Sequence, residues 1–281
     1  MVRVGGFGKS ALAVGAAVAA AGSAPAPVRS ETAASGIVRA TITYSIPPGY
    51  ASYDVRLAVD RAGKRVFEKR VPPYTRKLDQ IRPVAVHGGK AVHVRDLDGD
   101  GEPEILVDLF WGGAHCCWYS RIYRWIAARR TYASRAQFWG NFAYRLADLE
   151  RDRRWEFVSA DNRFAYAFTS FADSSWPIRI WTYRAGRLVH TTRAYAAVVA
   201  RDAADQWRRY RARRGRLPVR GFIAAWAADQ CLLGRCDAAF GRLQTLKATF
   251  SGPIDRQTSG PPGRFLRDLR AFLRETGYVP G

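Results

Sequence analysis

The chain has 281 residues, of which 48% are hydrophobic and 25% are charged, and its formal net charge at neutral pH is +21. No segment approaches the run of about 18 apolar residues that a membrane-spanning helix needs, so no transmembrane helix is expected. The positive charge comes from 39 Arg and only 6 Lys. This bias favours a compositional origin of the positive charge, with arginine at solvated positions. The alternative is that the charge serves binding to anionic polymers.

Residues 1–26 have the layout of a secretory signal peptide. Arg3 and Lys9 precede an apolar stretch from Ala11 to Ala21, which small residues and prolines follow. This stretch is too short to span a bilayer, and we expect cleavage between Ala24 and Ser30. The sequence therefore predicts an exported protein, secreted or associated with the periplasm or cell envelope. The small, polar residues 27–36 predict a disordered leader.

Residues 37–193 predict a β-rich domain. Apolar and polar residues alternate on both sides of "RAGK" between Ser52 and Val71, which is typical of a hairpin. The same pattern recurs at Ser120–Ala136 and at Ile178–Ala194.

Two segments that start 52 residues apart resemble each other: "RDLDGDGEPEILVD" from Arg95 and "ADLERDRRWEFVSA" from Ala147. Both place acids at equivalent positions, continue with an apolar pair and precede a hairpin. Few-stranded units repeated at such a spacing are typical of propeller blades or short β-arrays. We therefore expect an α+β protein with an incomplete, propeller-like array of hairpins.

Helical spacing replaces the strand pattern in the last part of the chain, residues 194–281, which predict a C-terminal α-helical region. We expect helices at residues 194–215, 218–234, 236–250 and 264–277. Residues 251–263 are rich in Gly, Pro and Ser and predict a loop.

The first of the two similar segments concentrates acids in a short loop. Its members stand at alternate positions and at the ninth: Asp96, Asp98, Asp100 and Glu104. Ca²⁺ takes six to eight oxygen ligands at about 2.3–2.6 Å, and alternate acids on a curled loop point toward one centre. Gly99 and Gly101 permit the positive φ that such a loop requires. The sequence predicts a Ca²⁺ site here, to which the carbonyl of Glu102 adds a further oxygen.

This loop, followed by an apolar strand, resembles the calcium-binding loops of FG-GAP and VCBS-type repeats in integrin-like propellers. The resemblance implies propeller-like strands, an exported or adhesive protein, and a metal ligand set of Asp96, Asp98, Asp100, Glu102 (backbone) and Glu104. The second segment offers a weaker metal loop: Asp148, Glu150, Asp152 and Glu156. There Arg151 and Arg153 replace both glycines, and their charges favour internal neutralisation without metal.

The four cysteines predict disulfides, because an exported chain meets an oxidising compartment. The pairing Cys231–Cys236 is favoured, since "CLLGRC" is typical of a turn between helices. It leaves Cys116 and Cys117 as a vicinal bridge or as free thiols. Crossed pairings between the two halves of the chain stay open.

No catalytic motif is recognisable, so we expect a non-enzymatic binding or adhesion protein with no catalytic residues at the cell envelope. Its partner would be an anionic envelope polymer, a surface carbohydrate or a protein. One alternative is an exported hydrolase whose site includes Asp108 and His115. Another is polyanion binding through Arg208–Arg216, although an exported protein meets little nucleic acid. The remaining histidines, His87, His93 and His190, have no partners at recognisable spacing.

Overall fold

The computed structural model describes residues 27–46, 53–77, 79–86, 89–113, 116–216, 218–252, 255, 257 and 259–279. The predicted signal peptide therefore lies outside the described residues, as do His87 and His115. None of the described helices is both long enough and apolar enough to cross a membrane.

Three antiparallel sheets make up the β-rich part of the chain. The first has the order β1-β2-β3-β4: Val28–Ser35, Val38–Ser45, Val55–Arg61 and Lys64–Arg70. The second has the order β5-β7-β8-β9, with β6 also paired to β7: Arg82–Pro83 (β5), Val92–Arg95 (β6), Glu104–Gly113 (β7), Cys116–Ile126 (β8) and Thr131–Gly140 (β9). The third has the order β10-β11-β12-β13: Arg145–Ala147, Glu156–Ala160, Ile178–Arg184 and Arg187–His190.

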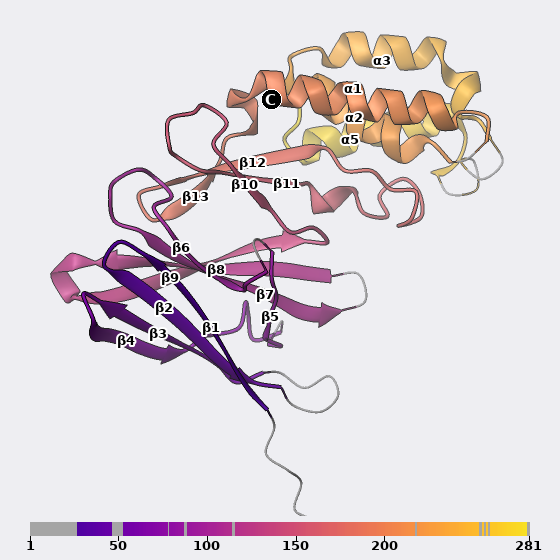
Figure 1. Cartoon of the computed structure of the whole chain (residues 1–281). Coiled ribbons are helices and arrows are strands. Elements are labelled where there is room, and N and C mark those ends of the chain that lie inside the picture. The colour runs from indigo at the N-terminus through magenta and orange to yellow at the C-terminus, as the bar shows by residue number, and fades with distance from the viewer. Residues whose placement is uncertain are drawn as a thin grey trace, which may run out of the picture.

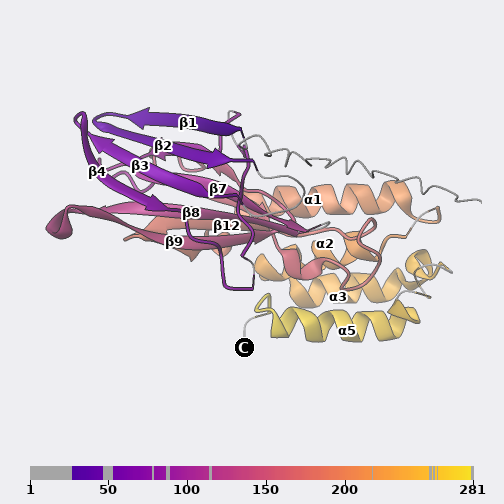
Figure 2. The same ribbon diagram turned by 90° about the horizontal axis from the view of Figure 1, so that it is seen from below.

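The sheets and helices stack in layers, with the first sheet at one end of the molecule and the helices at the other (Figures 1 and 2). Alternate side chains of β7 explain how the second sheet occupies the middle. Ile105 and Val107 pack against the first sheet, whereas Leu106 packs toward Phe157 of the third. The next residue of β11, Val158, faces the opposite way and contacts Tyr195 at the start of the helical region.

The helices share a core of their own. They are α1 (Ala196–Arg213), α2 (Arg220–Leu232), α3 (Cys236–Thr245) and α5 (Pro262–Glu275), with short 3₁₀ segments at Ala127–Arg129, Asn162–Phe164, Thr192–Ala194 and Lys247–Phe250. Phe164 and Phe168, from the segment between β11 and β12, join this core and attach it to the third sheet.

The expectation of an α+β protein that ends in a helical region is confirmed. The described residues form no closed propeller, only three open sheets. Within the sheets, the predicted hairpins appear as β3–β4, β8–β9 and β12–β13.

The prediction of a disordered leader at residues 27–36 is wrong, because these residues include strand β1, which pairs with β2 along its whole length. Its sequence lacks an apolar alternation because it is an edge strand with little burial. Polar contacts hold it instead. Glu31 accepts hydrogen bonds from the Tyr44 hydroxyl (2.8 Å) and the Ala91 amide (2.6 Å), and the Thr32 and Thr41 hydroxyls are 2.9 Å apart.

Candidate calcium-binding loop

The acidic loop connects β6 to β7 in the middle sheet. Arg95, the last residue of β6, pairs with Glu104, the first residue of β7, so the loop starts and ends at adjacent positions of one antiparallel ladder. It begins beside the ladder at Asp96. The strands on both sides are packed between two other sheets, which fixes the base of the loop.

Hydrogen bonds to Asp96 curl the backbone of this loop. The two carboxylate oxygens of Asp96 accept from the amides of Gly99 (2.7 Å) and Gly101 (2.9 Å). Gly99 has φ +75° and Gly101 has φ +85°, values that glycine adopts without steric cost. The predicted positive φ of both glycines is therefore confirmed.

Three carboxylates of the loop converge. One oxygen each from Asp96, Asp98 and Glu104 lie within 4.8 Å of one another. Two oxygens that bind the same Ca²⁺ are at most about 5 Å apart, since each lies about 2.3–2.6 Å from the ion. The spacing of these oxygens therefore fits a shared hard cation.

Glu104 gives the strongest indication of a ligand. Its side chain is 1% exposed; Oε2 accepts a hydrogen bond from the Leu97 amide (3.1 Å), whereas Oε1 has no partner among the described residues. Oδ1 of Asp98 is also buried without a partner there. Burial, with the nearby charges of Asp98 and Asp100, raises the pKa of Glu104 to about 8. A buried carboxylate is costly unless an opposite charge compensates it, and a bound cation would supply that charge.

Asp100 and Glu102 are used differently. Asp100 Oδ1 accepts from the Glu102 amide (2.8 Å), and its Oδ2 lies 3.4 Å from Arg124. The Glu102 carboxylate forms two hydrogen bonds with the Arg61 guanidinium (2.5 and 2.8 Å). Asp100 is therefore not among the three converging groups, and the side chain of Glu102 is engaged outside the loop. The carbonyl of Glu102 stays a predicted ligand.

The second acidic loop connects β10 to β11 and has a similar backbone turn. Asp148 accepts from the amides of Asp152 (3.0 Å) and Arg153 (3.1 Å), and Asp152 accepts from Arg154 (3.0 Å). Arg151 (φ +59°) and Arg153 (φ +66°) stand where the first loop has its glycines. The likeness of the two segments therefore extends from sequence to loop geometry.

The side chains of the second loop do not converge. Glu150 is exposed, and among the described residues only the first loop brings three potential ligands together. Glu156 is 1% exposed; it accepts a hydrogen bond from the Leu149 amide (2.9 Å) and is also bonded to the Tyr195 hydroxyl. The buried glutamate of the second loop therefore has two protein donors, whereas Oε1 of Glu104 in the first loop has none among the described residues. The four acids therefore do not assemble a cation site in this structure.

Asp108, the predicted acid of a hydrolase site, is fully buried. Its Oδ1 accepts from the Ser120 hydroxyl (2.6 Å) and the Tyr144 hydroxyl (3.1 Å), and burial raises its pKa to about 7. The Trp139 indole donates to Ser120 (2.8 Å), and His93 lies 3.8 Å from Asp108. A substrate cannot reach a carboxylate that is 0% exposed, so this acid belongs to the core.

The structure pairs Cys116 with Cys117 and Cys231 with Cys236. The second bridge joins the end of α2 to the start of α3.

The basic run Arg208–Arg216 lies at the end of α1, where Tyr210 is buried and Arg208 and Arg209 pair with Asp205. Farther along, Arg211, Arg214 and Arg216 are exposed.

The amino-acid sequence is similar to that of a cyanobacterial protein. A family model described as the sll0997 C-terminal domain matches residues 199–277, the helical region. The chain is 26% identical to "Probable thylakoid lumen protein sll0997" of Synechocystis sp. over 279 aligned residues, covering 87% of this chain and 74% of the relative. It is 31% identical to "Uncharacterized protein y4bJ" of Sinorhizobium fredii over 141 residues, which are 50% of this chain but 22% of that relative. No solved structure matches the chain significantly.

The resemblance to FG-GAP and VCBS-type repeats is wrong. The family model that matches lies in the helical region, and no FG-GAP or VCBS repeat family is found. The physical reason is that alternate acids with two glycines dictate a local turn, whatever the ancestry of the surrounding sheets. What bears on cation binding is the geometry of the loop and not its ancestry.

Proposed function

We propose that this protein is an exported, non-enzymatic binding protein of the cell envelope in which one Ca²⁺ orders the loop between β6 and β7. The observation that carries this proposal is the buried Oε1 of Glu104, which has no partner in the described part of the chain and lies beside oxygens of Asp96 and Asp98. Calcium fits better than a transition metal, since every converging ligand is a hard carboxylate oxygen and the converging set contains neither sulfur nor imidazole.

The ion is structural under this proposal. The loop is anchored outside the site by Arg61 on Glu102 and by Arg124 on Asp100, so an ion at its centre would lock β6, β7 and these arginines together. Ca²⁺ would also replace the proton that Glu104 otherwise needs in its buried position. No hydrolytic chemistry is assigned to the site.

Export is supported by the N-terminal sequence, by the two disulfides and by the relative from Synechocystis, whose description places that protein in the thylakoid lumen. A partner at the envelope, such as an anionic polymer, a surface carbohydrate or a protein, is part of the same proposal.

The two loops supply the experiment and its control. Calorimetric titration with Ca²⁺ should give saturable binding for the wild type, at about 10⁻⁴–10⁻³ M as in other extracellular modules. Asp98→Asn should abolish it, because the variant removes one converging charge. Glu150→Gln changes the equivalent position of the second loop and should bind like the wild type. Absence of heat in the wild type, or equal loss in both variants, would contradict the proposal.

A second candidate function is polyanion binding through the exposed arginines at the end of α1: Arg211, Arg214 and Arg216. Binding of this kind weakens steeply as salt increases, because each neutralised anionic group releases a counterion. Affinity for an anionic envelope polymer that does not change with salt would remove this candidate.

A further inference from the structure

A pocket lies at the seam between the third sheet and the helices, and no residue of either acidic loop lines it. Its volume is about 210 Å³, and its walls come from the start of β12, the segment after β13, and the ends of α2 and α5. We call it the seam pocket and define it by its polar residues Arg163, Arg179, His190 and Arg193 together with its apolar residues Ile178, Ala194 and Leu232.

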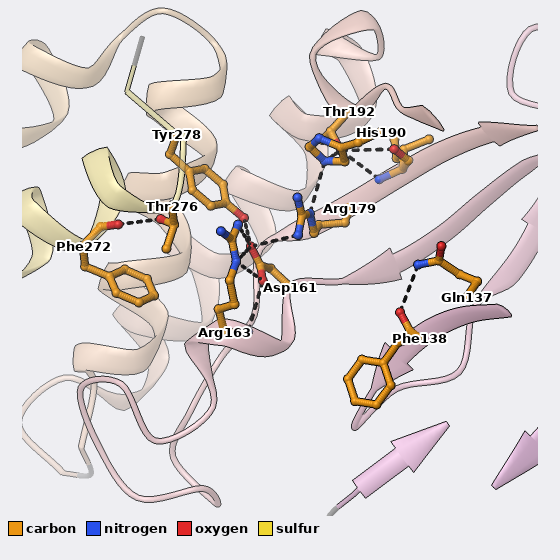
Figure 3. Close-up of polar contacts among 11 residues, drawn as sticks. Gln137, Phe138, Asp161, Arg163, Arg179, His190, Thr192, Phe272, Thr276 and Tyr278 are labelled. Carbon is orange, nitrogen blue, oxygen red and sulfur yellow. Dashed lines mark hydrogen bonds and ion pairs between the residues drawn. The ribbon is translucent and has the colours of Figure 1, made fainter. Parts of the chain in front are cut away.

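One buried carboxylate orients two of these arginines. Asp161 is 1% exposed and accepts from the Arg163 Nε (2.9 Å) and Nη2 (2.6 Å) and from the Tyr278 hydroxyl (2.8 Å). Nη1 of Arg179 lies 3.7 Å from the same carboxylate. Figure 3 shows Arg163, Arg179 and Tyr278 approaching Asp161 from different parts of the chain.

The two guanidinium groups differ in how many of their donors are used. The Arg163 guanidinium is bonded to Asp161 and also to the Tyr278 hydroxyl, whereas Nη2 of Arg179 donates to no acceptor among the described residues. Their side chains are 40% and 25% exposed, so both guanidinium groups are accessible at the pocket. A single carboxylate needs only one guanidinium for neutrality, which makes the second a surplus charge.

The neighbouring histidine is held neutral. Arg179 Nε donates to His190 Nε2 (3.2 Å), and the Thr192 hydroxyl lies 2.8 Å from the same nitrogen. Desolvation, followed by the charge of Arg179, lowers the pKa of His190 to about 4. Because Nε2 accepts, the proton of the neutral ring is on Nδ1, which is a further donor.

Arg193 serves the structure of the pocket. Its guanidinium donates to the carbonyls of Leu232 (3.4 Å), Gly277 (3.2 Å) and Tyr278 (2.7 Å), which ties the ends of α2 and α5 to the sheet. Those acceptors are neutral, so its charge is not cancelled there. Three guanidinium groups against the single carboxylate of Asp161 leave the seam pocket with a positive surplus.

We infer that the seam pocket is a binding site for a small organic anion, whose carboxylate or phosphate group is held by Arg163 and Arg179. Guanidinium groups fixed by a buried acid present their remaining N–H groups in a preorganised fork, the geometry that recognises such oxyanions. The apolar walls of Ile178, Ala194 and Leu232 would contact the rest of a small molecule. This site is independent of the proposed Ca²⁺ loop.

The test uses the full chain and two probes, inorganic phosphate and acetate, at constant ionic strength set by chloride. Isothermal titration or chemical-shift titration should show saturable binding of at least one probe, and comparison of the two decides between phosphate and carboxylate. Arg179→Gln should weaken binding roughly tenfold or more, because one of two charged donors is lost. Arg187→Gln, a surface arginine on β13 outside the pocket, is the matched control and should bind like the wild type.

A second variant keeps the charges and fills the space. Ala194 is exposed at the pocket, so Ala194→Phe should fold normally and block entry of the probe. Equal binding by Ala194→Phe and the wild type would overturn the inference, as would equal weakening by Arg187→Gln and Arg179→Gln. Absence of saturable binding of both probes to the wild type would overturn it as well.

Discussion

The two acidic loops of this protein have similar backbone turns and different surroundings. In both, the first aspartate binds two amides of the turn, two residues have positive φ, and a buried glutamate accepts the amide seven residues before it. In the first loop the other oxygen of that glutamate has no partner among the described residues, whereas in the second Glu156 is bonded to Tyr195.

This difference teaches that curling of an acidic turn is not sufficient for a cation site. The aspartate-to-amide bonds form in both loops, so they stabilise the turn with or without metal. What distinguishes the first loop is a desolvated glutamate oxygen for which the described residues supply no donor. That feature depends on which residue of a remote element packs against the glutamate.

The largest expected effect concerns a position in the strands after the two loops at which the two similar segments carry different residues. β7 carries the buried Asp108, and the equivalent position of β11 is Ala160. The pKa of Asp108 is raised from 3.8 to about 7, so the folded protein keeps a proton that the unfolded chain releases. The contribution of Asp108 to the unfolding free energy should therefore fall as pH rises from about 4 to 7, by roughly 4 kcal/mol at about 1.4 kcal/mol per pKa unit.

Urea denaturation across this pH range, without calcium, measures the effect. Asp108→Asn keeps an acceptor for Ser120 and Tyr144 but has no proton to lose. The slope of its unfolding free energy with pH should therefore be smaller than that of the wild type, by the equivalent of about one bound proton. Glu150→Gln, on an exposed carboxyl, is the control and should follow the wild type. Parallel pH curves for the wild type and Asp108→Asn would mean that Asp108 is already ionised in the folded protein, which would contradict its raised pKa.

The next effect separates the glutamates of the two loops. Glu104→Gln keeps an acceptor for the Leu97 amide and removes the charge, so Ca²⁺ should no longer stabilise the protein. For the wild type, about 10 mM Ca²⁺ should increase the unfolding free energy by roughly 1.4–2.7 kcal/mol at the affinities proposed above. Glu156→Gln should leave this increase intact. Denaturation with Ca²⁺ and with a chelator measures both variants, and an equal Ca²⁺ response in Glu104→Gln and the wild type would place the ion elsewhere.

A third effect tests what Tyr195 does for the second loop. Tyr195 is 8% exposed, and its hydroxyl is bonded to Glu156. Tyr195→Phe leaves a buried carboxyl without that donor and should cost about 1–2 kcal/mol of stability, the same with and without Ca²⁺. Tyr166 is 59% exposed, so Tyr166→Phe is the control and should be neutral. A neutral Tyr195→Phe would show that the hydroxyl does not distinguish the loops.

The features predicted correctly from the sequence depend on local spacing. The hairpins, the helices and the position of the acidic loop follow from alternation, helical period and the placement of glycines. The left-handed φ of Gly99 and Gly101 is of the same kind, since the pattern of the turn determines it.

The features not predicted depend on partners remote in the chain. Arg61 reaches Glu102 across 41 residues, and Tyr278 reaches Asp161 across 117. No local pattern marks such pairs, because they arise when the sheets and helices stack. The prediction of a disordered leader at residues 27–36 is wrong for the same reason, since the exposed edge strand β1 is defined by its pairing with β2 and not by an apolar face.

The smallest expected effect reverses sign between the loops. Gly101 has φ +85°, and a Cβ added there would meet nothing within 4 Å, so Gly101→Ala should destabilise the Ca²⁺-free protein by about 1 kcal/mol through backbone conformation alone. Arg153 has φ +66° at the equivalent position, so Arg153→Gly should relieve that cost and stabilise the protein by up to about 1 kcal/mol. Chemical denaturation in chelator measures both.

Opposite signs would show that the second loop keeps its left-handed turn despite arginine, because Asp148 and Asp152 hold it by their amide bonds. The same sign for both would mean that the two turns are held by different forces, and that their shared geometry does not reflect a shared mechanism.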